Sequence, residues 1–302
     1  MNHLKIALDW TPNANHIGFY VARELGFYND VNLDISIIDT SVDNYAVTPA
    51  KKVELGTVDL ALCPLESVMS YRSKTNAFPL KAIATLFQED LSAIVTLKKD
   101  AVQSPKDLSG KTYASYKARY EDAIVKQMII NDGGDGSLEI VYPEKLGIWE
   151  TIVNGSIDAT WIFTNWEGIQ AKQNQLELNY FKLKDYGIPY SYSPVIVASE
   201  DSIAQNGTTL EAFLQATKKG FYYAQQHPEK AATILKPLLA ASDQDIDLTA
   251  SITETCIALG TEKSWGTLKV DRVEQFLTWL QNHELEKHQL TASELFTNEL
   301  FS

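Results

Sequence analysis

The sequence has few cysteines, with 2 among its 302 residues. Cys63 and Cys256 lie far apart and fit no C-x-x-C spacing, so the sequence predicts neither a zinc site nor a redox motif. It leaves open whether the two form a disulfide. A glycine-rich phosphate loop, an H-E-x-x-H or G-x-S-x-G motif and a calcium loop are also missing. We therefore expect no metal and no cofactor, and the residues alone predict no reaction.

Long apolar runs and an excess of positive charge are missing as well. The longest apolar runs, such as 94–97 and 194–198, have the size of strands and fall far short of the roughly 20 residues of a membrane span. Lys and Arg number 26 against 39 Asp and Glu, and the formal charge of −13 disfavours nucleic acid and anionic membranes as partners. The N-terminus carries no basic and apolar stretch of the signal-peptide type. The protein is then cytoplasmic, or periplasmic or cell-surface if a signal was removed.

What the sequence does contain is a regular alternation of strand and helix patterns. Hydrophobic residues make up 45% and charged residues 22%, which is typical of soluble globular proteins of one large α/β domain or two lobes. The first series has strands at 4–9, 33–38, 58–62 and 81–86 and helices at 16–25, 44–55 and 65–73. The second has strands at 93–97, 111–115, 138–141 and 159–163 and helices at 120–131 and 149–153. This rhythm predicts mostly parallel sheets flanked by helices.

Two similar segments indicate that the two series are lobes of one plan. Gly56-Thr57-Val58-Asp59 and Gly155-Ser156-Ile157-Asp158 both end a helix with glycine and open a buried strand. Chance similarity of a common turn is the alternative. From 210 onward the pattern is helical, at 210–226, 228–238, 245–259 and 270–282. We expect lobe I to comprise 1–88 and 190–302 and lobe II 89–189, with crossings at 88–92 and 185–193.

Polar and aromatic side chains gather directly after the first strand, over residues 9–16. In open α/β sheets, ligands bind outside the carboxyl ends of the strands. We expect Trp10 to face a ligand there rather than the core, and Asn13, Asn15 and His16 to add polar contacts. The structural alternative is that an asparagine caps the following helix and that His16 is a satisfied surface residue.

A second loop, 163–168, places Trp166 and Glu167 after the strand at 159–163. An indole stacks on a planar ring, and a carboxylate accepts paired hydrogen bonds from an amino group and a neighbouring ring N–H. The pair therefore suits a flat, amino-bearing heterocycle. Alternatively, Trp166 packs on the sheet and Glu167 merely opens a helix, where the helix dipole favours it.

Three further segments supply candidates. Residues 115–121 contain Tyr116 and two cations and precede a helix N-terminus. They could form an anion site, or the cations could be solvated charges on the surface. Residues 63–67 follow a strand and contain Glu66, and 190–194 contain Tyr190 and Tyr192 at the second crossing. Cys63 as a nucleophile would need a histidine base, and among the histidines only His16 is near a strand-end loop, so we expect no cysteine catalysis.

The opening segment closely resembles the family of thiamine-pyrimidine-precursor proteins. The resemblance lies in Leu8-Asp9-Trp10-Thr11-Pro12-Asn13-x-Asn15-His16-x-Gly18-x-Tyr20-Val21-Ala22 and Gly26-Phe27-Tyr28. It continues through Gly56-x-Val58-Asp59, Asp107-Leu108-x-Gly110-Lys111, Gly155-x-Ile157-Asp158-Ala159, Trp166-Glu167-Gly168 and 227–232. The family joins bacterial solute-binding proteins for formylaminopyrimidine, which feed an ABC importer in thiamine salvage, with the fungal hydroxymethylpyrimidine phosphate synthase.

The resemblance implies the type II periplasmic-binding-protein fold, with a ligand held in a cleft between two lobes. It further implies a monomeric binder of formylaminopyrimidine or hydroxymethylpyrimidine that serves an ABC permease. Trp10 and one of Tyr190 or Tyr192 would stack on the pyrimidine, and Glu167 would hold its amino group. Binders of another flat heterocycle, such as a flavin or a purine, are an alternative.

The second alternative is the synthase. Its members are expected to carry a lysine for pyridoxal phosphate, a consumed histidine and a cysteine-rich run. This chain has Cys63 at the expected place of the lysine, Ser67 near that of the histidine, and residues 190–194 in place of the cysteine run. The resemblance therefore favours a binder.

Overall fold

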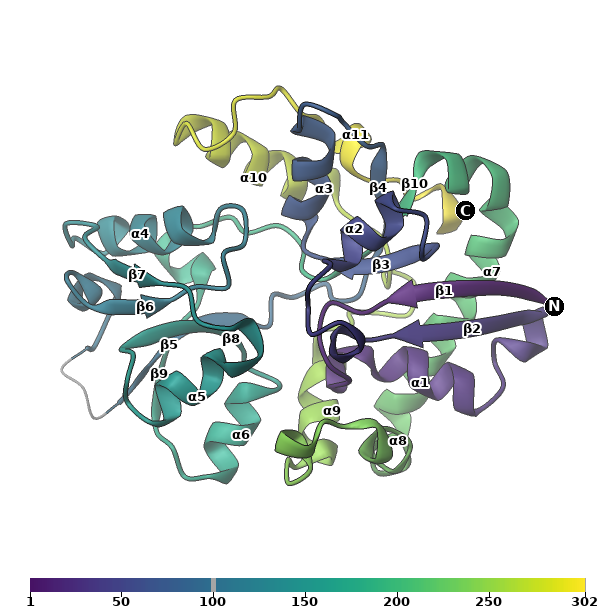
Figure 1. The fold of residues 1–302 in the computed structure, drawn as a ribbon, viewed down its shortest axis with the longest axis horizontal. Coiled ribbons are helices and arrows are strands. Elements are labelled where there is room, and N and C mark those ends of the chain that lie inside the picture. The colour runs from purple at the N-terminus through teal and green to yellow at the C-terminus, as the bar shows by residue number, and fades with distance from the viewer. Residues whose placement is uncertain (99–101, 302) are drawn as a thin grey trace. The chain divides into compact units, whose positions relative to one another are not determined.

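The computed structural model describes residues 1–98 and 102–301 and divides into two compact units (Figure 1). Unit 1 comprises residues 1–90, 191–274 and 288–302, and unit 2 comprises 91–190 and 275–287. Among the described residues, no helix is both long and apolar enough to cross a membrane.

Unit 1 contains a mixed sheet in the order β2-β1-β3-β10-β4. Its strands are β1 (Asn2–Ala7), β2 (Leu33–Ile38), β3 (Leu60–Cys63), β4 (Leu80–Thr85) and β10 (Val195–Ser199). β1 runs parallel to β2 and β3, whereas β10 runs antiparallel to both β3 and β4. β3 is buried along its whole length, as expected of a strand in the middle of a sheet covered by helices.

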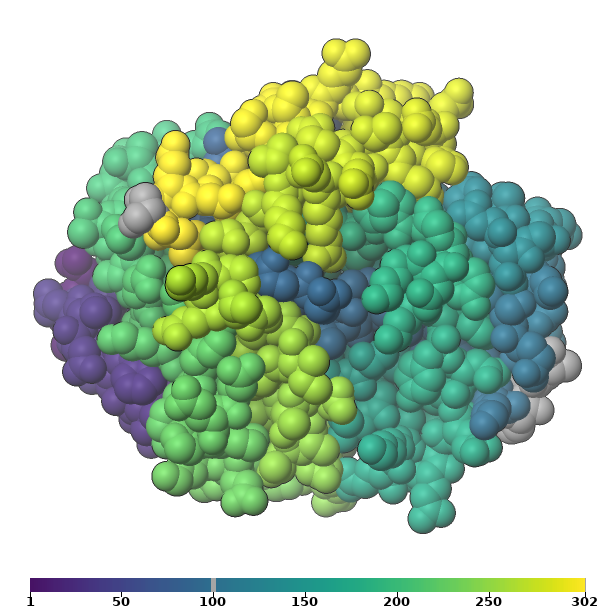
Figure 2. Space-filling model, turned by 180° about the vertical axis from the view of Figure 1, so that it is seen from behind, coloured from purple at the N-terminus to yellow at the C-terminus, as the bar shows by residue number. Residues whose placement is uncertain are grey.

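The helices of unit 1 come from both ends of the chain. They are α1 (Ile17–Glu24), α2 (Pro49–Glu54), α3 (Leu65–Ser73), α7 (Glu200–Gln226), α8 (Pro228–Leu235), α9 (Leu248–Ile257) and α11 (Ala292–Leu295). α1 packs against α7, and α8 packs against α1 and α9. Figure 2 shows this association on one face, where purple N-terminal residues lie against green residues. α1 begins directly after the loop 9–16, so its packing fixes where that loop ends.

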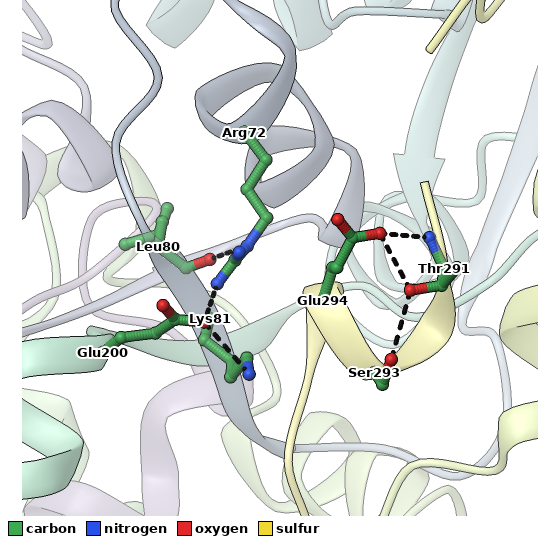
Figure 3. Close-up of polar contacts among 7 residues, drawn as sticks. All are labelled: Arg72, Leu80, Lys81, Glu200, Thr291, Ser293 and Glu294. Atoms are coloured by element: carbon green, nitrogen blue, oxygen red, sulfur yellow. Dashed lines mark hydrogen bonds and ion pairs between the residues drawn. The ribbon is translucent and has the colours of Figure 1, made fainter. Parts of the chain in front are cut away.

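Figure 3 shows two neighbouring groups of polar contacts in unit 1, one around Glu200 and one at the start of α11. Arg72 donates to the Leu80 carbonyl at 2.7 Å and to Glu200 at 2.5 Å, and Lys81 lies 3.1 Å from the same carboxylate. Burial raises the pKa of Glu200, but the hydrogen bonds from the two cations outweigh it and lower the pKa overall. Glu294 accepts from the backbone N–H of Thr291 at 2.8 Å and caps α11. Hydrogen bonds therefore tie α3, β4 and α7 together beside the capped start of α11.

Unit 2 repeats the plan with a sheet in the order β7-β6-β8-β5-β9. The strands are β5 (Ser92–Leu97), β6 (Thr112–Ala114), β7 (Glu139–Val141), β8 (Ala159–Phe163) and β9 (Leu178–Phe181), and the helices are α4 (Glu121–Asn131), α5 (Ile148–Val153) and α6 (Glu167–Gln173). β6 pairs in parallel with β7 and β8, and β5 runs antiparallel to β8 and β9. The predicted series of parallel strands and helices is confirmed, with one antiparallel strand in each sheet.

The two similar segments have the same structural role in the two units. Gly56 and Gly155 both adopt the left-handed conformation, with φ of 67° and 73°, that ends a helix. Asp59 accepts from the N–H of Lys5 at 2.7 Å, and Asp158 accepts from that of Thr112 at 2.8 Å. Each aspartate thus joins the start of its own strand to the neighbouring parallel strand, which confirms that the sequence similarity reflects a shared plan.

Residues 275–287 belong to unit 2, whereas the expected division placed the whole of 190–302 in one lobe. They lie partly in α10 (Val270–Asn282), whose first five residues are in unit 1. Phe276 packs edge-on to Tyr190, with 5.6 Å between the ring centroids. The buried carboxylate of Glu286 accepts from Arg119 and from the Tyr120 hydroxyl, both at 2.6 Å. Aromatic packing and a charge-assisted hydrogen bond therefore explain why residues 275–287 belong to unit 2 and not to the expected lobe I.

Candidate functional site

The loops after β1, β2 and β3 leave the same edge of the unit 1 sheet. Ala7 lies in register with Ile38 of β2 and with Ala61 of β3. Because the three strands are parallel, the segments that follow Ala7, Ile38 and Cys63 leave the sheet on the same side. This is the edge at which open α/β sheets place their ligands.

The loop 9–16 is held together by its own polar side chains. Asn13 accepts from the Asn15 N–H at 2.9 Å and donates from its side-chain nitrogen to the Thr11 carbonyl at 3.2 Å. Asn13, Asn15 and His16 are all buried. Asn13 therefore caps the 3-10 turn Ala14–His16, which is the structural alternative, and its side chain shapes the loop instead of making the expected ligand contact.

His16 is 0% exposed and uses both ring nitrogens within this loop. Its Nδ1 accepts from the backbone N–H of Asn13 at 3.3 Å, so the ring proton lies on Nε2, which donates to Oδ1 of Asp9 at 2.8 Å. The ring is covered, and the expected contact between His16 and a ligand stays a prediction. The effect of the ring is to orient Asp9, whose side chain is 18% exposed.

Trp10 is half-buried and packs against Tyr45, a residue that the sequence reasoning did not select. The ring centroids lie 5.9 Å apart with an interplanar angle of 59°. Burial, and next the negative charge of Asp9, raise the pKa of the Tyr45 hydroxyl. Asp9, Trp10 and Tyr45 are therefore neighbours at the strand ends of unit 1.

Tyr45 lies in a segment that was predicted as the beginning of a helix over 44–55. Asn44 and Tyr45 instead adopt left-handed backbone conformations, with φ of 50° and 61°, and α2 starts at Pro49 after the cap Thr48. Asparagine tolerates this conformation, but for an aromatic residue it is unusual and points to a functional constraint. The Thr-Pro pair was a signal for the true helix start.

Cys63 is the last residue of β3, Glu66 follows at the same edge, and both are buried. Burial, and next the charge of Asp9, raise the pKa of the Cys63 thiol, which keeps it protonated and unsuited to nucleophilic attack. Glu66 stands in the first turn of α3, where the helix dipole favours a carboxylate.

Tyr192 is a structural residue of unit 1. The side chain is 1% exposed, its hydroxyl accepts from the Lys269 N–H at 3.1 Å, and the Arg272 guanidinium lies 4.1 Å from its ring centroid. The ring is therefore covered by its own unit, and the expectation that Tyr192 stacks on a ligand stays a prediction.

In unit 2 the loops after β6 and β8 also leave one edge, since Ala114 lies in register with Thr160. Glu167 begins α6 and accepts from the Phe163 N–H at 3.0 Å, while its side chain stays only partly buried. Trp166 is buried, as in the structural alternative, and its contact with a ligand stays a prediction.

The predicted anion site at 115–121 is filled by a carboxylate of the chain. Glu121 accepts from the N–H groups of Tyr116 and Ala118, at 3.0 and 3.1 Å, and from the Tyr113 hydroxyl at 2.7 Å. Burial raises the pKa of Glu121, against the effect of these hydrogen bonds. The backbone donors that would have held an anion are already engaged.

Tyr116 and Tyr190 remain in unit 2 as half-buried aromatic candidates. Burial, and next the charge of Glu167, raise the pKa of Tyr116. Tyr190 contacts Trp161 edge-on, with 5.3 Å between centroids. Trp161 is one of the partly buried residues of β8, and the sequence reasoning did not select it. Among the described residues, no group of acidic, histidine or cysteine side chains could hold a metal ion.

Comparisons with known proteins identify the family of the chain and similar proteins. A family model described as NMT1/THI5 like matches residues 13–231. The formylaminopyrimidine-binding protein of Halalkalibacterium halodurans is 26% identical and covers 98% of this chain and 89% of its own. The 4-amino-5-hydroxymethyl-2-methylpyrimidine phosphate synthase of Legionella pneumophila subsp. pneumophila is 24% identical and covers 78% of this chain and 73% of its own.

The fold is also found in a solved structure. The ligand-binding component of an ABC-type import system from Staphylococcus aureus superimposes with a TM-score of 0.71 at 12% identity. The alignment covers 100% of this chain and 98% of that one. The two-lobed solute-binding-protein fold implied by the sequence is confirmed.

Proposed function

Because the chain belongs to the NMT1/THI5-like family, we propose that it binds a thiamine pyrimidine precursor of the formylaminopyrimidine or hydroxymethylpyrimidine type. The observation that carries the proposal is the neighbourhood of Asp9, Trp10 and Tyr45 at the strand ends of unit 1. Two aromatic rings and a carboxylate suit a planar, amino-bearing ring. The name of the Halalkalibacterium relative supports the same ligand class.

In unit 2 we assign ligand contacts to Glu167, Tyr116 and Tyr190. Glu167 holds the Phe163 N–H with one oxygen, Oε2, and the ring of Tyr190 stands against Trp161. The hydroxyl of Tyr116 is a hydrogen-bond donor at neutral pH, and burial and the charge of Glu167 raise its pKa further. These groups offer an acceptor, a hydroxyl and an aromatic face to the same class of ligand.

As the cellular role, we propose delivery of the pyrimidine to an ABC importer by a monomer in the periplasm or at the cell surface. The Staphylococcus structure supports this role through its fold. The formal charge of −13 also agrees with a small-molecule ligand and disfavours nucleic acid.

The second candidate is the synthase, favoured by the Legionella relative. Pyridoxal phosphate is held as an imine, which needs a lysine amine, and the chain has the buried thiol of Cys63 at the expected position, the end of β3. Cys63 has no amine to form an imine with pyridoxal phosphate, and burial keeps its thiol protonated, so this position does not fit that cofactor. We therefore place the binder first.

Calorimetry with the purified chain tests the proposed function. We expect saturable heat with formylaminopyrimidine or with 4-amino-5-hydroxymethyl-2-methylpyrimidine, at one site per chain. Addition of pyridoxal phosphate should give no imine absorbance band. Heat from neither pyrimidine would refute the ligand class, and an imine band would favour the synthase.

Glu167→Gln should weaken pyrimidine binding by more than about 1 kcal/mol, roughly fivefold or more in Kd, because one acceptor becomes a donor that faces the ligand's donors. Calorimetry of this variant and of Glu139→Gln, an exposed carboxylate of the same unit, measures the difference. An affinity equal to that of the control would remove Glu167 from the site.

A further inference from the structure

We propose that Asp9 accepts the exocyclic amino group of the ligand, and that His16 positions Asp9 to do so. The proposal rests on the proposed function, since it assumes that a pyrimidine binds at the strand ends of unit 1. It assigns the selection of amino-bearing rings to a residue pair within one loop.

The first step is the division of exposure between the two side chains. His16 is 0% exposed and Asp9 is 18% exposed, so the imidazole faces the interior of the unit while the carboxylate reaches its surface. A ligand at this edge can touch Asp9 but not His16. His16 therefore acts through Asp9.

The second step is the direction of the hydrogen bonds. The Asn13 N–H donates to Nδ1 of His16 and fixes the proton on Nε2, which donates to Oδ1 of Asp9 at 2.8 Å. Oδ2 of Asp9 has no hydrogen-bond partner among the described residues. With Oδ1 anchored, the plane of the carboxylate is fixed and Oδ2 points in one direction, as in a preorganised binding group.

The third step is the chemistry around that oxygen. Trp10 follows Asp9 in the chain and packs on Tyr45, whose hydroxyl is close enough for the charge of Asp9 to raise its pKa. An ionised carboxylate only accepts hydrogen bonds. A planar ring against Trp10 therefore meets Asp9 with a donor at its edge, and an exocyclic amino group is such a donor.

Selectivity follows from the same geometry. A site that is built to pair with an N–H strongly rejects an analogue that lacks it, because a buried polar group is then left unpaired. A ring with hydrogen in place of the amino group loses the contact with Asp9 but keeps the contact with Trp10. The ratio of affinities for the two rings therefore reports on Asp9 and not on stacking.

The experiment is calorimetry of the wild type, Asp9→Asn and Asp30→Asn with two ligands. The ligands are 4-amino-5-hydroxymethyl-2-methylpyrimidine and its analogue with hydrogen at position 4. Asp9→Asn should weaken binding of the amino compound by about tenfold or more, and that of the analogue by less than about twofold. Asp30 is exposed in the same unit, and its variant should change neither affinity.

Two variants of His16 test the positioning role by the same affinity ratio. His16→Gln keeps a donor toward Asp9 and should retain most of the preference for the amino compound. His16→Leu should lose the preference and still bind the analogue, which also shows that the variant is folded. Equal losses for both ligands in every variant would show a purely structural role and overturn the proposal.

The two levels of the argument fail in different ways. If the wild type binds neither ring, the proposed function fails and this inference falls with it. If the wild type binds and prefers the amino compound, but Asp9→Asn keeps the full preference, only this inference is overturned.

Discussion

Replacement of Trp10 by alanine is expected to weaken pyrimidine binding by about a hundredfold. Stacking of a nucleobase-like ring on an aromatic side chain contributes about 1–3 kcal/mol by alanine substitution. Trp10 also supports Tyr45, since the two rings pack with 5.9 Å between their centroids. Removal of the indole takes away one stacking surface and the support of the second, so we expect a loss near the top of that range.

The matched variant is Trp10→Phe, which keeps an aromatic face. We expect its affinity to stay within about fivefold of the wild type, since stacking is tolerant of the ring that supplies it. Calorimetry gives both affinities, and thermal unfolding shows whether the variants are folded. Full affinity in a folded Trp10→Ala would place the ligand elsewhere and contradict the site.

The sheet plan could be predicted because its signal is local and periodic. The expected bounds of β2, α3, β8 and α10 are those of the structure. Short apolar runs of four to eight residues that are bounded by turn signals are typical of buried strands, and their length separates them from helices. The two units and their similar turns at Gly56 and Gly155 follow from the same signal.

The strand-end position of the site could also be predicted, but the roles within it could not. Trp10 is partly exposed as expected, whereas His16 and Tyr192 are covered by their own unit. A polar side chain in a loop looks the same in the sequence whether it faces a ligand or satisfies a buried donor. The partners of these side chains, such as Lys269 for Tyr192, are distant in sequence.

Tyr45 was missed because a left-handed turn leaves no periodic pattern of apolar residues in the sequence. The left-handed φ of Asn44 and Tyr45 turns the chain just before α2, and a helical pattern was extended over them. The unit to which residues 275–287 belong could not be predicted either, because it depends on contacts with residues distant in the sequence. The sequence predicts one helix over 270–282, but its division between the units depends on contacts of Phe276 and Glu286 with residues far along the chain.

Gly220→Ala is expected to destabilise the protein by about 3 kcal/mol. A Cβ at Gly220 would lie 2.0 Å from the Gly18 carbonyl oxygen and 3.0 Å from the Ala22 side chain. The nearest obstacle is backbone, so α1 and α7 have to separate, and a well-packed core resists such separation. α1 begins where the loop 9–16 ends, so a shift of α1 also moves that loop. We therefore expect the folded fraction of the variant to bind the pyrimidine more weakly.

Gly207→Ala on the same helix is the control. It separates the steric clash with α1 from the effect that any glycine-to-alanine change in α7 has on stability. A Cβ at Gly207 meets only Leu300, at an ordinary 3.9 Å. Gly207 directly follows Asn206, whose non-helical backbone interrupts α7, so alanine gains less here than the roughly 1 kcal/mol of a helix interior, and this variant should be about as stable as the wild type. Urea unfolding compares the two variants, and equal stabilities would show that α1 and α7 can shift apart without cost. Lower stability of Gly220→Ala alone, together with lower affinity, would show that the contact of these two helices holds the loop of Asp9 and Trp10 in place.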